Sequence, residues 1–470
     1  MKQHLIVGTA ILSLLTGCMV GPKYHRPAVK PPDVFRGSTD PRPPTDPASL
    51  ADLKWFEVFK DERLQDLIRT ALVENYDLRD AVARVAAARA NLGITRSDQF
   101  PNLAAGAEVT TQRLSRNGSS PLPAGIDSER TFGSVTLNLL SFEVDLWGRL
   151  RRSTEAARAD LLAAEENRKA VVTTLVAEVS SSYFNLIELD TELEIAKRTL
   201  DSRQESLRLI KLRAQGGVAT LLDVRQAEQL VYLTTQTIPD IERLIEQTEN
   251  QISLLLGKPP AEVARGRRLI AQAQPPAVPP GLPSSLLERR PDIRAAEQNL
   301  MAANAIIGVA KAAYFPRISL TGLIGGQSNQ LNNLFSGPSR TWSFVPQVTQ
   351  PIFTAGRIKS NVKLAEAERQ MALVRYERVI QTSFRETSDA LVEQRQVKEI
   401  RAQRELLVTT LQDRSRLAYL RYRGGVDTLL NALDADRDLF NAELNLARTR
   451  RDELLALVGL YKALGGGWQQ

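Results

Sequence analysis

The chain of 470 residues has few of the side chains that usually carry out catalysis or hold metal ions. It contains two histidines, His4 and His25, and one cysteine, Cys18. Histidine is the most frequent general base and metal ligand, and a lone cysteine has no disulfide partner. The sequence also lacks a Gly-rich phosphate loop that ends in Lys-Ser or Lys-Thr. We therefore expect no enzymatic activity, no cofactor and no metal site.

Long hydrophobic runs are missing beyond the N-terminus. After Cys18 there is no run of about 18 apolar residues, the length that a membrane-spanning helix needs. The net charge of +7 is spread along the chain, with acidic and basic residues interleaved, and no basic block alternates with aromatic residues. Nucleic-acid binding is therefore not expected.

The first residues are typical of an export signal. Lys2 is followed by an apolar run over residues 5–15, which ends in Leu15-Thr16-Gly17-Cys18. Small residues before a cysteine suit a lipoprotein signal peptidase, so we predict removal of residues 1–17 and lipid attachment at Cys18. Acyl chains at about 0.8 kcal/mol per buried CH₂ give a firm anchor. The alternative is an ordinary signal peptide with an incidental cysteine. Met19, by resemblance to bacterial lipoproteins, favours sorting to the outer membrane.

The rest of the sequence is an internal duplication. Residues 212–222 resemble residues 420–430 at an offset of 208, while residues near the start of each half are related by an offset of 215. The shared motifs are Asp77-Leu78-Arg79 with Asp292-Ile293-Arg294, Phe100-Pro101 with Phe315-Pro316, Gly148-Arg149 with Gly356-Arg357, and Leu256-Gly257 with Leu464-Gly465. The change of offset places about seven extra residues, and hence a loop, between Pro101 and Gly148.

This duplication divides the chain into a series of segments. A lipidated tether over residues 18–60, rich in proline, precedes a first repeat over 61–270. A Pro-rich linker over 271–283 leads to a second repeat over 284–470. Each repeat has the same order of a helix, Phe-Pro, a variable segment, Gly-Arg, a long helix, Gly-Gly-Val and a shorter helix.

Proline and glycine are both absent from two long stretches, residues 149–215 and 357–423. Apolar residues in the first stretch alternate at spacings of four and three, the pattern of a coiled-coil seam. They are Val172, Val176, Val179, Tyr183, Leu186, Leu193, Leu200 and Leu207. Each stretch would be about 100 Å long as a helix. Helices over 219–256 and 427–464 are expected to follow, after chain reversals at Gly216-Gly217 and Gly424-Gly425.

Strand pairs are predicted in the variable segments, at about 102–147 and 317–354. Apolar and polar residues alternate there over lengths of about ten residues, which is typical of transmembrane β-barrel strands. The loops at 114–129 and 328–339 are rich in Ser, Asn, Gly and Pro. The apolar phase changes after Leu139, which a bulge or passage into a helix explains, and Pro346 lies inside a strand. The alternative is a soluble hairpin in each half.

Four strands cannot close a barrel, and open edges are not tolerated in lipid. Several copies must therefore pool their strands, and three copies would supply twelve. The number three is not fixed by the sequence itself.

Several motifs, in their order along the chain, resemble those of a known family. They are the lipoprotein motif at Cys18, residues 142–149, the paired Gly-Gly-Val motifs, Arg290-Pro291-Asp292-Ile293 and residues 460–468. Over nearly the whole chain they resemble the TolC-type outer-membrane efflux factors, in the lipoprotein branch (OprM/NodT-like). The resemblance implies a mainly α protein with a membrane β-barrel, whose duplicated protomer trimerises into a twelve-stranded β-barrel and an α-helical barrel of long coiled-coil helices.

The resemblance also implies the function and the partners. The homotrimer would be the passive exit duct of a tripartite efflux system, carrying drugs or other small molecules across the periplasm and outer membrane. Its partners would be outer-membrane lipid, a periplasmic adaptor (membrane fusion) protein and an inner-membrane RND or ABC pump. The alternatives are the duct of a type I protein secretion system and a non-transporting, lipid-anchored periplasmic coiled-coil scaffold.

The family match places a periplasmic gate at Leu430 and Asp434, which are four residues apart and share a helix face. In a symmetric trimer each would form a ring, one blocking water and ions and one favouring cations. Some relatives have a second aspartate where this chain has Asn431. The matching positions for a latch are Asp223, Tyr422 and Asp427. Because Asp427 stands where some relatives have a basic residue, a salt-bridge latch is in doubt, while an Asp223–Tyr422 hydrogen bond is still allowed.

Overall fold

The computed structural model describes residues 19–37, 49–115, 123, 125, 127–272 and 283–468. The predicted signal sequence and Cys18 lie outside these residues. Two compact units are present, and each draws residues from both sequence repeats. The first unit takes its described residues from 1–28, 85–164 and 296–376, and the second from 29–84, 165–295 and 377–470. The repeats seen in the sequence are therefore not the compact units, because equivalent elements of the two repeats pack together.

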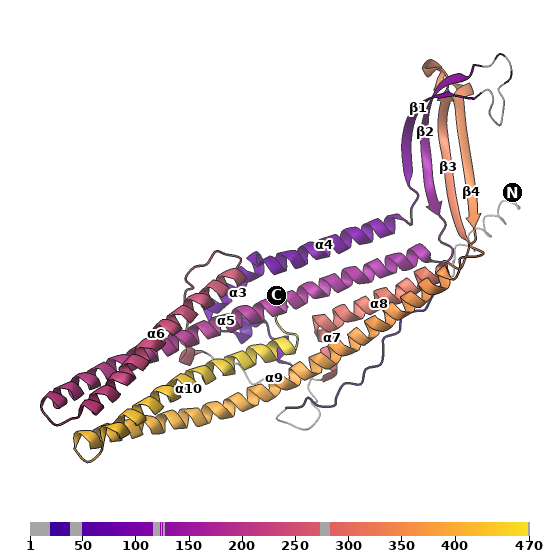
Figure 1. Cartoon of the computed structure of the whole chain (residues 1–470). Helices are drawn as coiled ribbons and strands as arrows, with labels where there is room; N and C mark the ends of the chain where they lie inside the picture. The colour runs from indigo at the N-terminus through magenta and orange to yellow at the C-terminus, as the bar shows by residue number, and fades with distance from the viewer. Residues whose placement is uncertain are drawn as a thin grey trace. The chain divides into compact units, whose positions relative to one another are not determined.

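The first unit contains one antiparallel sheet in the order β1-β2-β3-β4 (Figure 1). Its strands are β1 (Leu103–Arg113), β2 (Glu129–Glu143), β3 (Arg317–Ser328) and β4 (Arg340–Thr349). The register between β2 and β3 shifts between Leu139 and Phe142, so of the two explanations for the change of apolar phase, a bulge or passage into a helix, the structure has the bulge. Pro346 lies in β4, an edge strand of the protomer's sheet, opposite Leu320 of β3.

One face of this sheet is apolar across all four strands. Ala105, Leu137, Ile324 and Trp342 are directly paired, and so form one row across the sheet. Leu137, Ile324 and Trp342 are 47%, 63% and 75% exposed in the protomer. The bulge keeps Phe142 on this face. Phe142 pairs with Leu320, and Leu320 lies on the same face as Gly322 and Ile324 because alternate residues of a strand point to one side. A continuous apolar face that its own chain leaves uncovered is the surface expected of strands in lipid.

Long helices connect the sheet-bearing unit with the second unit along the chain. They are α4 (Tyr76–Ser97), α5 (Arg149–Gln215), α8 (Pro291–Ala312) and α9 (Arg357–Arg423). Helices α5 and α9 each have 67 residues, over the same residues as the two stretches without proline or glycine. The return helices α6 (Leu221–Leu255) and α10 (Leu429–Ala463) have 35 residues each. They begin two residues later than expected, because Thr220 and Thr428 are the N-cap residues.

One window of α5 is long and apolar enough to cross a membrane by length and composition. Its mean hydropathy is 1.3, and 56% of the window is buried inside the protein. Val176, Val179 and Tyr183 on this part of α5 are almost fully buried. The apolar residues of α5 thus form core packing, as in the middle helix of a bundle.

The described residues between Met19 and Lys60, which are 19–37 and 49–60, are packed rather than a free tether. Arg152 of α5 donates hydrogen bonds to the backbone carbonyls of Val20 and Gly21. In the second unit, Phe35 and Trp55 are 3% and 4% exposed. Short helices form at η1 (Leu50–Asp52) and α2 (Trp55–Val58), ahead of α3 (Glu62–Glu74). Buried aromatic side chains and bound backbone groups hold these described residues against the helices.

Candidate functional site

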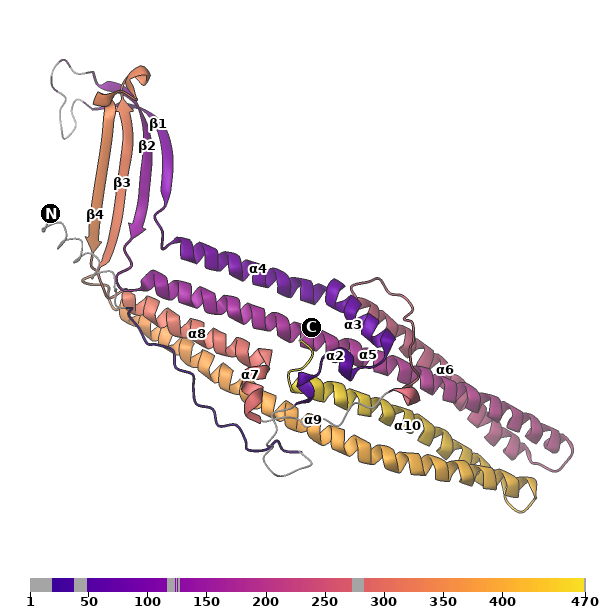
Figure 2. The ribbon, with the colours of Figure 1, turned by 180° about the vertical axis from the view of Figure 1, so that it is seen from behind.

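The two long helices each reverse at a Gly-Gly pair, and both turns lie at the same end of the two hairpins (Figures 1 and 2). Gly217 and Gly425 have positive φ angles of 75° and 72°. Val218 N–H donates to the Arg213 carbonyl at 2.9 Å, and Val426 N–H donates to the Arg421 carbonyl at 3.1 Å. These bonds end each helix with a left-handed residue, for which glycine carries no Cβ penalty. Gly216 and Gly424 precede this position and have no positive φ.

Beside the turns, the two hairpins pack together through a small apolar cluster. Ile210, Val224, Ala227 and Leu230 of the first hairpin meet Leu429 and Leu433 of the second. Leu430 and Asp434 lie next to these buried residues on α10 but face outward, with exposures of 49% and 39%. Asp434 makes an ion pair with Arg437 at 3.2 Å. The two predicted gate residues therefore share an exposed helix face that the protomer's own packing leaves free.

The three predicted latch residues make other contacts within the described part of the protomer. The Asp223 carboxylate accepts hydrogen bonds from the Thr220 backbone N–H and hydroxyl, both at 2.8 Å, as half of a capping box. The Tyr422 ring lies under the Arg213 guanidinium, 4.7 Å from ring centroid to Cζ. No Asp223–Tyr422 hydrogen bond joins these two side chains in the protomer as described. The Thr220 backbone N–H and hydroxyl are the donors to the Asp223 carboxylate instead.

Asp427 has basic and amide partners on its own hairpin. It forms an ion pair with Arg421 at 3.1 Å and accepts a hydrogen bond from the Asn431 side chain at 2.6 Å. These hydrogen bonds, led by that from Asn431, lower the pKa of the Asp427 carboxyl. Asp427 thus stays ionised in neutral solution and steadies the second turn, a role that the sequence alone did not indicate.

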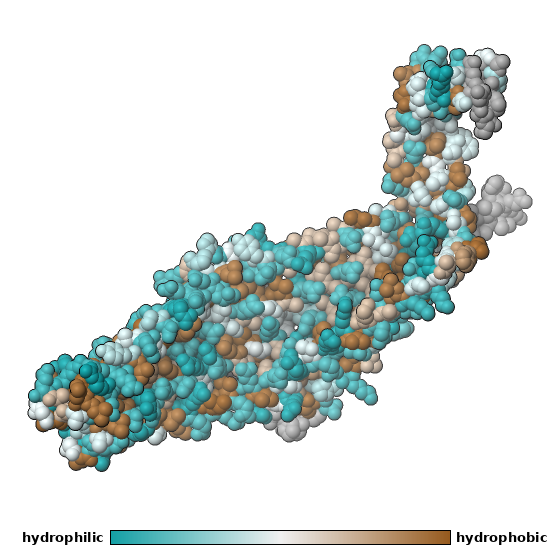
Figure 3. All heavy atoms as spheres, in the orientation of Figure 1, coloured by the Kyte–Doolittle hydropathy of each residue, from teal (hydrophilic) through white to brown (hydrophobic). Residues whose placement is uncertain are grey.

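Apolar side chains are exposed where the hairpins turn, as the brown patches among polar residues in Figure 3 show. Val218, Leu221 and Leu222 are each more than 60% exposed. Between the ends of α5 and α9 lies a groove of about 610 Å³, with Ile210 and Tyr422 in its lining. Exposed apolar residues grouped at one end of a soluble coiled coil are typical of a protein interaction surface.

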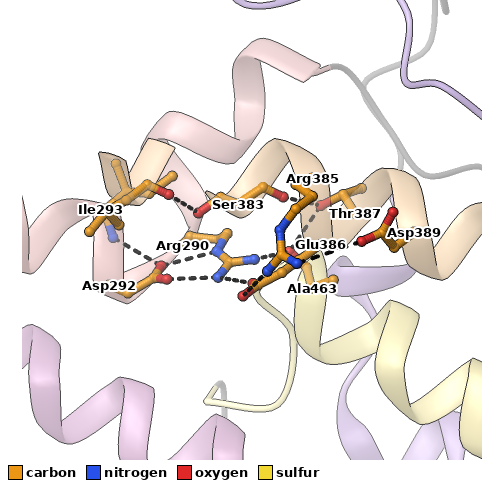
Figure 4. Close-up of polar contacts among 10 residues, drawn as sticks. Arg290, Asp292, Ile293, Ser383, Arg385, Glu386, Thr387, Asp389 and Ala463 are labelled. Carbon is orange, nitrogen blue, oxygen red and sulfur yellow. Dashed lines mark hydrogen bonds and ion pairs between the residues drawn. The ribbon is translucent and has the colours of Figure 1, made fainter. Parts of the chain in front are cut away.

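The Arg290-Pro291-Asp292 motif forms a buried joint at the other end of α10. Arg290 donates a hydrogen bond to the Ala463 carbonyl at 2.8 Å, and its guanidinium pairs with Asp292 at 2.7 Å and Glu386 at 2.8 Å (Figure 4). Thr387 donates to the same carbonyl at 3.3 Å. The joint therefore binds the C-terminal end of α10, where backbone carbonyls lack helical partners, to α8 and α9.

The first repeat has a counterpart of this joint. Asn75, which is equivalent to Arg290 in the repeat, donates its side-chain N–H to the Leu255 carbonyl at the end of α6, at 3.0 Å. Leu255 is in turn equivalent to Ala463. Sequence comparison found the flanking Asp77 and Asp292 but missed this pair, since asparagine and arginine do not resemble each other. The two side chains have a common role, since each donates a hydrogen bond to a backbone carbonyl at the end of a return helix. That role can be seen only in the structure.

A second group that the sequence did not reveal is a set of buried charges along α5. Glu188, Glu192 and Arg203 have at most 5% exposure in a helix that is otherwise packed with apolar side chains. Burial, and then the neighbouring Glu192 carboxylate, raise the pKa of Glu188 to about 8. Polar residues at seam positions are the signal that predicts such a group, but their partners on α10 are more than 200 residues away in the sequence.

Comparisons with known proteins agree with this architecture. The profile of the outer membrane efflux protein family matches residues 67–258 and 282–466. The toluene efflux pump outer membrane protein TtgC of Pseudomonas putida is 40% identical over 475 residues, covering 100% of this chain and 97% of the relative. Outer membrane protein OprJ of Pseudomonas aeruginosa is 39% identical over 482 residues, with the same coverage of 100% and 97%.

A solved structure of a similar chain supports the same assignment. The open state of the MtrE outer membrane channel of Neisseria gonorrhoeae has a TM-score of 0.87 and 34% identity, covering 96% of this chain and 99% of that chain. The predicted fold class, that of the trimeric TolC-type channels, is confirmed by this likeness and by the four-stranded sheet and long hairpins. The chain belongs to the outer membrane efflux protein family, and it is an outer-membrane channel component of an efflux system.

Proposed function

We propose that the chain is a homotrimeric, lipid-anchored exit duct that receives small organic molecules from a periplasmic adaptor and an inner-membrane pump. The observation that carries this proposal is the apolar face that runs across all four strands and is left uncovered by the protomer. Strands β1 and β4 are the free edges of the sheet. Pairing β1 of one copy with β4 of the next satisfies both edges and gives twelve strands from three copies.

The duct is passive and carries out no catalytic step. Transport then depends on a pump, and the apolar hairpin ends around Val218 and Leu221 offer a surface for the adaptor. The name of the relative TtgC, a component of a toluene efflux pump, supports small apolar organic compounds as the cargo class. The secretion-system alternative would need a folded or unfolded polypeptide as cargo, and no feature of the described residues favours it.

The duct proposal is tested by transport and by subunit count. A strain that lacks its own outer-membrane efflux channels should regain resistance to toluene-like compounds when this chain is expressed with its cognate adaptor and pump. Native mass spectrometry of the detergent-extracted protein should give a trimer. A stable monomer, or no gain of resistance with the complete system, would contradict the proposal.

The closed end of the duct is assigned to Leu430 and Asp434, supported by their exposure on one face of α10 beside the packed seam. Leu430→Ala combined with Asp434→Ala removes both the apolar and the acidic ring, so single-channel conductance in planar bilayers should rise several-fold. Val426→Ala is a matched control because Val426 is also exposed, in the turn before α10. Unchanged conductance in the double variant would contradict the assignment of the gate to Leu430 and Asp434.

The lipid anchor is assigned to Cys18. Support comes from the sequence around it and from the packed segment that follows, where the Val20 backbone N–H donates to the Trp147 carbonyl at 3.0 Å. Mass spectrometry of the mature N-terminus should find an acylated cysteine in the native chain. Cys18→Ser should abolish acylation, and a native chain that begins at another residue would contradict the anchor.

A further inference from the structure

Four arginine–carboxyl contacts cross from α5 of the first hairpin to α10 of the second. They join Glu188 to Arg451 at 3.2 Å, Glu192 to Arg448 at 2.6 Å, Arg198 to Glu443 at 2.5 Å and Arg203 to Asp436 at 2.7 Å. Positions rise along α5 as they fall along α10, so the pairs form one antiparallel ladder. The ladder ends at Arg203, directly before the apolar cluster that contains Ile210, Leu429 and Leu433.

The sign of the charge reverses along this ladder. On α5 the acidic residue Glu192 comes first and the basic residues Arg198 and Arg203 follow, while α10 carries the complementary order. Glu188 adds a hydrogen bond that its carboxyl accepts from Arg451. A slide of α10 by seven residues along α5 would place Leu455 near Glu192 in one direction or Leu429 near Arg203 in the other, and most of the opposite charges would no longer meet. Charges placed in a helix seam in this way specify one register, as polar residues do in coiled coils.

Arg203 has the most extensive contacts of the ladder. Its side chain is 4% exposed, and besides Asp436 it donates to the Thr234 hydroxyl at 2.5 Å and to the Leu230 carbonyl at 3.3 Å. The guanidinium also lies 5.0 Å from the centroid of the Phe440 ring. It thereby ties α5 and α6 of the first hairpin to α10 of the second. One terminal nitrogen of Arg203 is buried without a hydrogen-bond partner among the described residues. A buried unsatisfied donor costs free energy, so these contacts do not give the greatest stability that the site could have.

The contacts of Arg203 also define how α10 is rotated. Leu429, Leu433, Asp436 and Phe440 lie at spacings of four and three and so form the seam of α10. Leu430 and Asp434 each follow a seam residue by one position, which places them about 100° around the helix. Turning α10 by one residue in either direction would bring Ala435 or Arg437 opposite Arg203. Neither accepts a hydrogen bond from the guanidinium, and Arg437 repels it.

We propose that Arg203 is a positioning residue for the gate, which holds α10 in the rotation that keeps Leu430 and Asp434 off the packed seam and turned outward. The proposal rests on the gate assigned above. Arg203 touches neither gate residue and acts through Asp436 and Phe440. Because it also binds α6, any movement of the second hairpin away from the first must first release this guanidinium.

The test replaces both partners of the pair, so that no buried charge is left alone. Arg203→Met combined with Asp436→Leu keeps the volume and is expected to leave the trimer close to wild-type heat stability. The matched control is Arg414→Met with Asp438→Leu, since that pair at 2.8 Å also involves α10 but joins it to α9 of the same hairpin. Arg203→Lys, which keeps the charge and loses the fork of hydrogen bonds, should give an intermediate result.

Two readouts separate this proposal from the gate itself. Spin labels on cysteines at Val218 and Val426, both more than 60% exposed, report the distance between the two hairpin turns. The Arg203/Asp436 variant should lengthen and broaden that distance distribution and raise the conductance several-fold, while the control pair changes neither. An unchanged distance would overturn the role of Arg203, and a changed distance with unchanged conductance would overturn its link to the gate. If Leu430→Ala with Asp434→Ala also leaves conductance unchanged, the gate assignment fails, and the spin-label distance alone decides whether Arg203 fixes the hairpin.

Discussion

The two helical hairpins of this protein have the same dimensions but are held at their ends by different interactions. Both consist of a helix of 67 residues and a return helix of 35. At the C-terminal end of its return helix, the first hairpin is held by the neutral Asn75 side chain, and the second is held by the charged Arg290 network. The first turn is closed by the Thr220–Asp223 capping box, and the second by the Arg421–Asp427 ion pair.

This difference shows which properties a duplicated duct has retained and which have diverged. Helix length is fixed by the distance that the wall must span, so both copies keep it. The side chain at the joint differs, since it is neutral in the first copy and charged in the second, which also carries the proposed gate residues Leu430 and Asp434. Charged contacts respond to pH and ionic strength more than neutral hydrogen bonds do. The joint of the second hairpin is therefore more sensitive to ionic strength than the joint of the first.

The largest difference in stability between the two hairpins is expected when the joint residues Arg290 and Asn75 are each replaced by alanine. Arg290→Ala leaves Asp292 without its buried partner and the Ala463 carbonyl with one donor fewer, which should cost about 3 kcal/mol or more. Asn75→Ala loses one neutral hydrogen bond and should cost about 1–2 kcal/mol. The measurement is heat denaturation of the detergent-extracted trimer. Equal losses for the two variants would mean that the charges add nothing to the second joint.

The glycine beside each joint gives a second contrast. Gly257 and Gly465 have φ angles of 66° and 81°, so alanine is strained at either position by about 1–2 kcal/mol. At Gly257 a Cβ would also clash with the Glu74 backbone carbonyl, whereas at Gly465 its nearest neighbour is the flexible Arg290 side chain at 3.1 Å. Gly257→Ala should therefore lower the denaturation temperature more than Gly465→Ala. The reverse order would show that the first joint moves more easily than its contacts indicate.

The buried carboxyl of Glu188 makes the first hairpin sensitive to pH in a way that the second is not. Gln396 stands at the equivalent position of the second repeat, so Glu188→Gln gives both copies the same residue. The pKa of Glu188 is raised from 4.5 to about 8, so the folded protein holds a proton that the unfolded chain releases. The stability from this group is full below about pH 4.5 and is lost as the pH rises to about 8.

Heat denaturation measured across this range should show the effect. The native protein should lose stability between pH 5 and pH 8 relative to Glu188→Gln, which has no proton to release. Glu194→Gln is the control, since that carboxylate is largely exposed and its pKa is lowered by the Arg268 side chain. A native profile parallel to that of Glu188→Gln would show that Glu188 titrates normally.

Much of this architecture could be predicted from the sequence, because it depends on local patterns. The absence of proline and glycine predicted α5 and α9. The change of apolar phase after Leu139 predicted either a bulge or passage into a helix, and the register shows the bulge. The contacts that set the hairpins in place could not be predicted. Arg203 and Asp436, or Arg290 and Ala463, are far apart in the sequence, and their meeting depends on how the helices pack. The local pattern of residues along one helix does not say which distant residues that helix will contact.

The smallest contrast lies at the two turns. The Thr220 hydroxyl accepts a hydrogen bond from the Asp223 backbone N–H at 3.1 Å, whereas Thr428, its equivalent, makes no side-chain cap bond. Thr220→Ala should therefore cost about 1 kcal/mol at the start of α6, and Thr428→Ala should cost close to nothing at the start of α10. Hydrogen exchange at the first turns of α6 and α10 measures both in the intact trimer. Faster exchange in α10 after Thr428→Ala would mean that the second turn depends on its threonine as well as on Asp427, and the two turns would then be closed by more similar means than their contacts indicate.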